Sequence, residues 1–369
     1  MKLKFEKGNL LNGLQIVEKA IPKHTMQPIL ECVVIDATKD KVKLNTYDGD
    51  MSICCTVDGD IQQEGMSAID AKILVPIIKK MPDGEVTITV KDDATATIKG
   101  GRVKFDVPCR SADDFPALPM VDIFSNTVTM SQYTLKEAIR TTIFSCGDVA
   151  SANKAMSGEL FELSGDRLTI VSLDGHRISI RNSDLRKSYD PAKVIIPGKA
   201  LSEIMKILSG NVEEDVTIAL EDKYATFIFG NTVIVTRLIE AEYFDLSRML
   251  NIAFSTKITV NRRAFLDCVD RATLLVKEGD KKPFILETGD GVLDVRLASV
   301  LGKFDDQLDA IVTGQPIKIG FNPLFVVDAL RAIDDEEITI NLSSPRTPCS
   351  IQDDEQSYNY IILPVALKE

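Results

Sequence analysis

A segment pattern that occurs three times is the feature that most constrains how this chain can fold. Each copy has an apolar stretch at helical spacing, an acidic or glycine-containing turn, and a strand-like stretch in which apolar and polar residues alternate. The three copies are residues Ile73–Val90, Leu201–Leu220 and Phe325–Leu342. Their strand-like parts start at Val86, Val216 and Ile338, which are 130 and 122 residues apart. A period of this length indicates three whole domains in tandem and not a solenoid of short repeats.

A second, weaker repeat precedes the first one in each copy. A short strand-like segment comes directly before an apolar helical segment at residues 3–5 and 10–20, 127–130 and 133–146, and 257–260 and 265–276. Each unit therefore reads strand, helix, strands, helix, strands, which is typical of an α+β domain of about 120 residues. We predict three such domains, at residues 1–124, 125–252 and 253–369.

Six apolar segments are expected to be helices. They are residues 7–19, 70–81, 131–147, 197–210, 261–278 and 322–334. In the second of them Asp70 is a suitable N-terminal cap, but Pro76 lies inside the apolar pattern. Because proline is tolerated in the first turn of a helix, where its N–H would be unpaired anyway, we expect this helix to start near Lys72 or Ile73.

The composition argues against several classes of protein. No apolar run approaches the roughly 20 residues of a membrane span, and the first residues lack the apolar core of a signal peptide. The seven cysteines are odd in number and form no CxxC pair, so neither a disulfide framework nor a zinc site is expected. We therefore expect a reduced, cytoplasmic protein without a metal or a cofactor.

Charge is distributed unevenly along the chain. The six expected helices together carry a formal charge of +5, so with −12 for the whole chain the remaining residues carry −17. Five of the six helices are positive. If they shared one surface, that surface would be basic within an acidic body and could face nucleic acid. Lysines on ordinary solvated helix faces explain the same numbers equally well.

One short segment, residues 172–178, looks like a functional site. It follows an apolar strand and contains the hairpin-type dipeptide Asp174-Gly175 and one of the two histidines, His176. Asp174 and His176 could serve a metal-assisted hydrolase as ligands or as a base with its orienting acid. A structural histidine is the favoured interpretation, because no second histidine cluster, carboxylate pair, nucleophile elbow or phosphate-binding loop accompanies it. A purely structural scaffold is a third alternative, although it gives no reason for basic helices.

Four motifs, taken in order on the threefold repeat, resemble one known family. They are Pro28–Leu30, Asp114–Pro119, Asp174–Arg177 and Tyr360–Val365. With them the whole chain resembles the beta subunit of the bacterial replicative DNA polymerase, the sliding clamp. The resemblance implies three clamp domains per chain and a ring-shaped, head-to-tail homodimer, with helices lining a central hole and antiparallel sheets outside.

The resemblance also implies the function. Such a ring encircles duplex DNA without reading its sequence and is a non-catalytic processivity factor. It tethers the replicative polymerase, the clamp loader and repair proteins, which dock short linear motifs between the second and third domains. No metal or cofactor is implied, and no membrane.

Two sets of site residues follow from the resemblance and from helix position. The expected DNA-facing residues are His24, Lys72, Lys79, Lys80, Lys136, Arg140, Lys199, Lys206, Arg262 and Arg271. The expected residues of the partner-peptide pocket are Met156, Ser172, Gly175, His176, Arg177, Ile178, Phe244, Arg248, Met249, Ile361, Leu363, Pro364 and Val365. Phe244 stands where the family often has proline, and Ala366 belongs to a tail in which an arginine is common. The resemblance therefore implies the general function but not which partner motifs are preferred.

Overall fold

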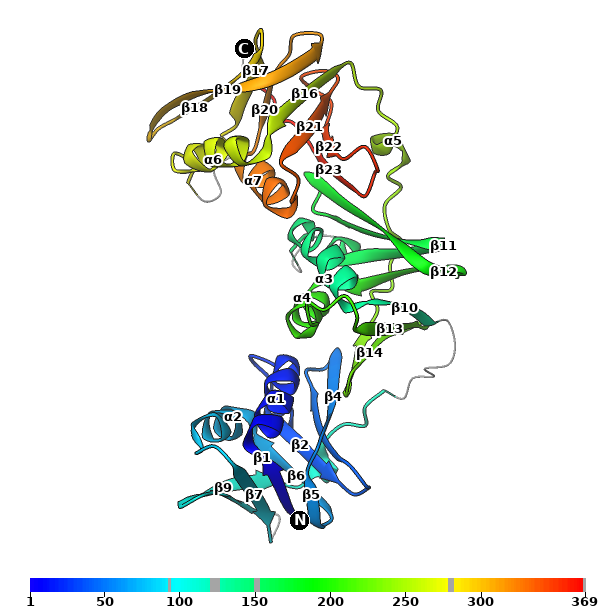
Figure 1. The fold of residues 1–369 in the computed structure, drawn as a ribbon, viewed down its shortest axis with the longest axis vertical. Coiled ribbons are helices and arrows are strands. Elements are labelled where there is room, and N and C mark those ends of the chain that lie inside the picture. The colour runs from blue at the N-terminus through cyan, green and yellow to red at the C-terminus, as the bar shows by residue number, and fades with distance from the viewer. Residues whose placement is uncertain (92–93, 120–126, 149–152, 278–281, 368–369) are drawn as a thin grey trace. The chain divides into compact units, whose positions relative to one another are not determined.

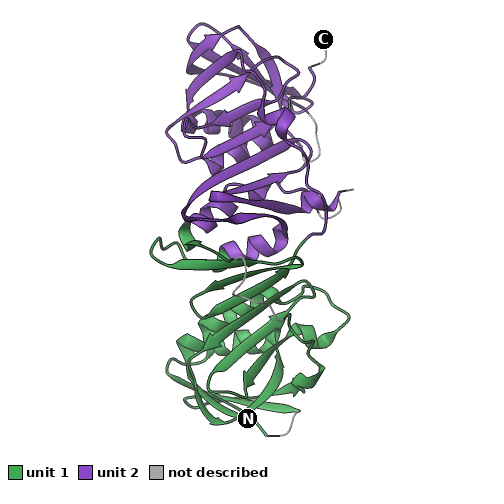
Figure 2. Cartoon of the chain, turned by 90° about the vertical axis from the view of Figure 1, so that its right-hand side faces the viewer, with its two compact units in different colours: residues 1–133, 206–238 green, residues 134–205, 239–369 purple. Residues whose placement is uncertain are grey.

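The chain forms two compact units. The computed structural model describes residues 1–91, 94–119, 127–148, 153–277 and 282–367. Unit 1 contains Met1–Tyr133 and Lys206–Leu238, and unit 2 contains Thr134–Met205 and Ile239–Glu369 (Figure 2). The predicted middle domain is therefore divided between the units. The predicted boundary at 124/125 lies outside the described residues, and that at 252/253 stays a prediction. Across the described ranges, no helix is both long and apolar enough to cross a membrane.

Unit 1 is built on one sheet of 13 strands, all paired antiparallel. The spatial order is β10-β13-β14-β15-β4-β3-β2-β6-β9-β8-β7-β1-β5. The strands are β1 Lys2–Glu6, β2 Cys32–Ala37, β3 Val42–Tyr47, β4 Met51–Val57, β5 Asp60–Gln63, β6 Gly65–Asp70, β7 Glu85–Val90, β8 Thr95–Gly100, β9 Val103–Arg110, β10 Thr127–Ser131, β13 Asp215–Leu220, β14 Tyr224–Phe229 and β15 Thr232–Arg237. The sheet becomes continuous because β15 pairs with β4, 175 or more residues away in sequence.

Two helices of unit 1, α1 (Lys7–Val17) and α2 (Ala71–Lys80), pack against each other (Figure 1). Asp70 caps α2 as predicted, accepting a hydrogen bond from the N–H of Lys72 at 2.8 Å. The predicted start at Lys72 or Ile73 is wrong, because the helix begins at Ala71 and Pro76 is its sixth residue. Pro76 is exposed, and burial of apolar side chains on the opposite side outweighs the poor helix propensity of proline.

Unit 2 is built on one sheet of 10 strands (Figure 1). The spatial order is β11-β12-β23-β22-β21-β16-β19-β18-β17-β20. The strands are β11 Gly158–Leu173, β12 Arg177–Pro197, β16 Thr256–Asn261, β17 Phe284–Thr288, β18 Val292–Ser299, β19 Gly302–Gly314, β20 Lys318–Phe321, β21 Glu337–Leu342, β22 Cys349–Gln352 and β23 Tyr358–Ile362. The long β11–β12 hairpin joins the rest through β23, in a register that runs from Arg177 opposite Ile362 to Arg181 opposite Tyr358.

The helices of unit 2 cover the core of the predicted third domain. Helices α6 (Arg262–Thr273) and α7 (Pro323–Ala332) pack against each other, and α6 also contacts β16, β18 and β19. The short α5 (Ser247–Leu250) was not predicted, because four residues give no periodic signal. Helices α3 (Gln132–Arg140) and α4 (Gly198–Ile207) each have residues in both units.

Short 3-10 turns complete the fold, and one of them explains an error in the predicted helices. The turns are Glu18–Ala20, Pro28–Glu31, Ala112–Asp114, Ile143–Ser145 and Lys154–Ser157. The helix expected over 131–147 ends at Arg140 and is followed by the turn Ile143–Ser145. Thr141 and Thr142 stand where it ends. The Thr141 hydroxyl donates to the carbonyl oxygen of Glu137 at 2.8 Å and the Thr142 hydroxyl to that of Ala138 at 2.7 Å, and such bonds weaken a helix. The other five predicted helices are confirmed, with ends that shift by a few residues.

Candidate functional site

The turn between β11 and β12 is fixed by its own aspartate. The carboxylate of Asp174 accepts hydrogen bonds from the N–H groups of His176 (2.9 Å) and Arg177 (3.1 Å). Gly175 has a φ of +86°, a conformation that side chains with a Cβ rarely adopt. The Asp-Gly pair therefore forms the tight turn that the sequence predicted and leaves His176 exposed.

Arg177 makes contacts in three directions. Its Nε donates to Asp174 Oδ2 at 2.9 Å, its Nη1 to Asp328 Oδ2 at 2.6 Å, and its Nη2 to the carbonyl oxygen of Phe144 at 2.6 Å. The guanidinium carbon also lies 5.3 Å from the ring centre of Phe144 and 4.6 Å from that of Phe325. Its side chain is 12% exposed. The charge of Arg177 is therefore neutralised within the protein.

His176 lies beside the same helix. Its ring stacks on Phe325 of α7, with centroids 6.0 Å apart and planes at 19°. Its carbonyl oxygen accepts the N–H of Leu363 at 2.9 Å. Within the described part of the chain, no group of three or more His, Cys, Asp and Glu side chains is arranged to hold a metal ion.

Next to this turn the apolar residues of the hairpin, the C-terminal strand and the α5 segment form one group, called here the apolar cluster. Its half-buried members are Met156, Ile239, Leu246 and Met249. Its buried members are Ala155, Leu160, Val171, Leu173, Ile178, Ile180, Ile195, Tyr243 and Ile361. The hydroxyl of Tyr243 donates to the carbonyl oxygen of Val171 at 3.0 Å and ties the segment before α5 to β11. The cluster is thus a buried floor with flexible methionine and leucine side chains at its surface.

Several predicted pocket residues meet in this cluster. Met156, Ile178, Met249 and Ile361 all belong to it. A Cβ on Gly175 would lie 3.9 Å from the terminal methyl of Met156, so the turn and the methionine are neighbours.

The other predicted pocket residues lie at the margin or beneath the sheet. Phe244 is 37% exposed and packs edge-on against Tyr243, and Arg248 is exposed on α5. Ser172 is fully buried, and its hydroxyl donates to the carbonyl oxygen of Thr142 at 2.5 Å. The prediction that Ser172 lines the pocket is therefore wrong, because strand alternation turns its side chain to the opposite face.

The segment after β23 is held at two points. The N–H of Leu363 donates to His176, and the N–H of Val365 donates to the carbonyl oxygen of Gly320 at 2.8 Å. A Cβ on Gly320 would lie 2.7 Å from a methyl carbon of Leu367, closer than carbon atoms can approach. Glycine at 320 thus lets this segment dock, which leaves Leu363, Pro364 and Val365 half-buried.

Sequence reasoning missed Phe325 and Asp328 as parts of the site. Both lie on α7, where Phe325 reads as an ordinary core residue of the third repeat. The cap Asn322 marks where the helix begins, but it does not indicate which segment the helix faces. The partner of each is more than 140 residues away, so no local pattern reveals the pairing.

The opposite face of the hairpin carries a buried polar layer. Ser145 and Ser179 share a hydrogen bond of 2.6 Å, and Ser172 is bonded to Thr142. Glu159 is fully buried, and neither of its carboxyl oxygens has a hydrogen-bond partner among the described residues. Burial raises the pKa of Glu159 to about 8, although the nearby Thr142 hydroxyl acts in the opposite direction. Burial likewise raises the pKa of its neighbours Cys146 and Tyr243, so the neutral form of all three groups is favoured.

The predicted DNA-facing residues of unit 1 are mostly exposed. Lys79 and Lys80 are exposed in the last turn of α2 and form no ion pair with any residue in the described ranges. His24 is exposed in the segment after α1, and Lys206 is exposed at the end of α4. Lys72 is different, because its ammonium group pairs with Glu31 at 2.9 Å.

The predicted DNA-facing arginines of unit 2 are engaged by the protein itself. Arg140 pairs with Glu137 at 2.6 Å and Asp334 at 3.2 Å, and Arg271 pairs with Asp306 at 2.5 Å. Arg262 donates to the carbonyl oxygens of Asp335 (2.7 Å) and Leu330 (3.3 Å). Of the two lysines in this unit, Lys136 is half-buried on α3 and Lys199 is exposed on α4.

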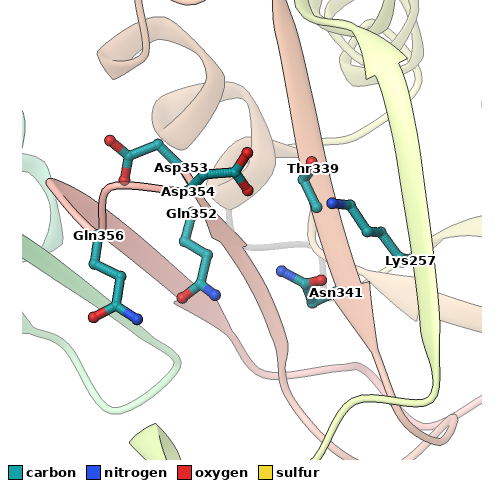
Figure 3. Close-up of a pocket in the computed structure, with 7 residues that line it drawn as sticks. All are labelled: Lys257, Thr339, Asn341, Gln352, Asp353, Asp354 and Gln356. Atoms are coloured by element: carbon teal, nitrogen blue, oxygen red, sulfur yellow. The ribbon is translucent and has the colours of Figure 1, made fainter.

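A separate hollow lies on the sheet of unit 2, with a volume of about 180 Å³. Figure 3 shows that its side chains come from β16, β21, β22 and the turn after β22. They are Lys257, Thr339, Asn341, Gln352, Asp353, Asp354 and Gln356. All seven are polar, so this hollow offers no apolar surface for a peptide anchor.

Comparison with known proteins agrees with the geometry along the whole chain. Residues 1–119, 129–245 and 248–366 match the N-terminal, central and C-terminal domains of the DNA polymerase III beta subunit family. The beta sliding clamp of Staphylococcus aureus is 30% identical over 99% of both chains. A crystal structure of a putative DNA polymerase III beta subunit from Eubacterium rectale is 46% identical, covers 99% of both chains and has a TM-score of 0.96.

A third relative was solved with a ligand. The sliding clamp of Pseudomonas aeruginosa bound to griselimycin is 22% identical, covers 100% of both chains and has a TM-score of 0.92, which shows a shared fold. The three matched domains and the relatives together favour the clamp over the hydrolase and scaffold interpretations. The chain belongs to the DNA polymerase III beta subunit family and is a DNA sliding clamp, a non-catalytic processivity factor of DNA polymerase.

Proposed function

We propose that the apolar cluster of unit 2 is the site at which this clamp holds its partners. These are the replicative polymerase, the clamp loader and repair proteins, each inserting a short linear motif with apolar side chains. One observation carries the proposal: half-buried Met156, Leu246 and Met249 lie on a buried floor beside an exposed histidine. An apolar floor with a few polar groups at its margin is what a peptide anchor requires.

The margin of the cluster supplies the polar and aromatic contacts. His176 and Arg248 are exposed there, on the hairpin turn and on α5. Phe244 adds a large apolar side chain that is 37% exposed. We infer that Phe244 widens the apolar margin and shifts the preference toward motifs with bulky residues at that position.

Calorimetry with griselimycin, and with peptides from the polymerase of the same organism, tests this site. Met156→Ala should weaken binding about tenfold or more, because it removes an anchor that covers the floor. Met26→Ala is the matched control, since Met26 is a fully exposed methionine in unit 1 and should change nothing. Unchanged affinity in Met156→Ala would place the partner site elsewhere.

We propose that duplex DNA is held by the helix cations without sequence specificity. Lys79 and Lys80 give the strongest support, because they are exposed and unneutralised within the described residues. Contacts between lysines and phosphates carry no sequence information and let a clamp slide. The test is retention on DNA after loading: the protein should stay on a closed circle and leave the same DNA once it is cut.

We propose that two chains close a ring head to tail. Two strand edges support this, one in each unit. Residues 103–107 of β9 pair with β8 on one side, and residues 302–309 of β19 pair with β18 on one side, while neither stretch has a second partner among the described strands. Open edges can pair with another chain, and two different edges used twice give a closed dimer.

A further inference from the structure

We propose that Arg177 is a positioning residue of the partner site and not a contact for the partner. It holds the β11–β12 turn to helix α7 and so sets the place of His176. This inference rests on the pocket proposed above, and it assigns to Arg177 a different role from the pocket-lining role that the sequence suggested.

The hydrogen bonds of Arg177 connect three segments that are distant in sequence. Asp174 is on the turn itself, Phe144 is on the 3-10 turn after α3, and Asp328 is on α7, 151 residues away. Each bond involves a charged donor, and two also involve a charged acceptor, so they are stronger than neutral hydrogen bonds. The fork of the guanidinium thus fixes the relative positions of all three segments.

The surroundings of the guanidinium leave it little to offer an incoming peptide. It lies against the rings of Phe144 and Phe325, and its side chain is 12% exposed. To bind a partner, Arg177 would have to leave Asp328 and uncover both rings. Removing one member of a part-buried ion pair is unfavourable, because the other charge then has no partner.

Phe325 links the clamped arginine to the exposed histidine. The same ring lies against Arg177 and stacks on His176. The carbonyl oxygen of His176 in turn accepts the N–H of Leu363, which begins the segment after β23. Arg177 therefore acts on the pocket through Phe325, the ring of His176 and Leu363.

The two histidines make this arrangement measurable in the full-length protein. The imidazole region of its NMR spectrum contains His24 and His176 alone, and His24→Gln assigns both signals. In the unmodified protein the Phe325 ring should displace the His176 signal from that of exposed His24. Asp328→Asn and Arg177→Met should each move it toward the His24 position and weaken griselimycin binding about tenfold.

A double-mutant cycle then separates positioning from direct contact. If Asp328 acts through Arg177, adding Asp328→Asn to Arg177→Met should change the affinity by less than about twofold. Arg181→Met is the matched control: Arg181 lies on the same strand and bonds to Ser357, away from the turn, so both readouts should stay unchanged.

Three results would overturn the proposal or the pocket beneath it, and they are distinguishable. In the first, Arg177→Met weakens griselimycin binding without moving the His176 signal, and Asp328→Asn changes neither the signal nor the affinity. Arg177 would then contact the ligand directly. A His176 signal unmoved in both variants, with unchanged affinity, would reject the positioning role and leave the pocket standing. Absence of griselimycin and polymerase-peptide binding to the unmodified protein would reject the pocket, and with it any role of Arg177 in partner binding.

Discussion

The two units use helix cations in different ways. In unit 1, Lys79 and Lys80 end α2, exposed and without an ion pair to any described residue. In unit 2, Arg140 and Arg271 donate to carboxylates, and Arg262 donates to backbone carbonyls. The lysines and the arginines contribute equally to the formal charge. The paired arginines, however, stabilise the protein and add little to the electrostatic field outside it. The comparison predicts that DNA binding depends on the lysines more than on the arginines.

The largest expected effect is on the dimer. The open strand edges of the two units differ in sequence, but each lacks a second strand partner among the described residues. Phe105 on β9 is 41% exposed beside the open edge of unit 1. Phe105→Asp should raise the dissociation constant of the dimer about 100-fold or more, because it places a charge at the apolar centre of the proposed interface. Light scattering over a dilution series measures the dimer.

Val212→Asp is the control for that experiment. Val212 is also an exposed apolar residue of unit 1, but it lies in the turn before β13 and not on an open edge. It should leave the dimer intact. If the two variants dissociated equally, or if the unmodified chain were monomeric at micromolar concentration, the edge-to-edge ring would be wrong.

The next effect concerns stability. Among the described residues, the buried side-chain atoms without a hydrogen-bond partner are the carboxyl oxygens of Glu159 in unit 2 and the hydroxyls of Ser67 and Thr226 in unit 1. Folding raises the pKa of Glu159 from 4.5 to about 8. Between these two pKa values the group is protonated in the folded state while the unfolded chain ionises. The contribution of Glu159 to stability is therefore complete below pH 4 and is lost as the pH rises toward 8. The loss approaches about 1.4 kcal/mol per pH unit within that window.

Glu159→Gln should remove this slope, since glutamine does not titrate. Urea unfolding at pH 5, 6.5 and 8 measures the free energy of unfolding for both proteins. The free energy of unfolding of Glu159→Gln, relative to that of the unmodified protein, should increase as the pH rises. Glu162→Gln is the control on the same strand. The Glu162 side chain is 47% exposed and lies 3.7 Å from Lys193, so the pH dependence of stability in this variant should match that of the unmodified protein. A parallel pH dependence in Glu159→Gln would show that the carboxyl is ionised or solvated in the folded state.

The smallest effects come from single surface cations and sharpen the comparison directly. Lys79→Met and Lys80→Met should each reduce the salt slope of DNA binding by about one phosphate contact and leave stability unchanged. Arg271→Met should do the reverse. It should lower the free energy of unfolding by less than about 1 kcal/mol, because Arg271 is 53% exposed and its pair with Asp306 is solvated on that side, and it should leave the salt slope unchanged. Filter binding at several salt concentrations and urea unfolding distinguish the two patterns. Equal salt slopes for all variants would show that the whole field of the protein acts on DNA.

Much of the fold followed from periodicity in the sequence. The alternating stretches that start near Val86, Val216 and Ile338 became β7, β13 and β21, each beginning one residue earlier. The Asp174-Gly175 turn was predictable because its chemistry is local. The end of α3 was not, since apolar residues continue after Arg140 although two threonines and other poor helix formers stand there.

The candidate site was predictable in its apolar part and not in its polar part. Met156, Ile178 and Ile361 came from the family resemblance, and the structure brings them into one cluster. The sequence could not show that Ser172 faces the other side of the hairpin or that Arg177 is already paired. Both depend on partners brought close only by the tertiary fold, as does the isolation of Glu159.

The pairing of β12 with β23 also has a consequence for how the protein is made. Arg177 of β12 lies opposite Ile362 of β23. The edge of β12 that faces β23 therefore has no strand partner until about 180 further residues have left the ribosome. At typical synthesis rates of 5–20 residues per second, that interval is on the order of 10 to 40 seconds. During it, a strand edge with open hydrogen-bonding groups is available for incorrect pairing. A slow phase in folding is therefore expected to involve the partner site, as well as the β4–β15 pairing of unit 1, which spans a similar length of chain.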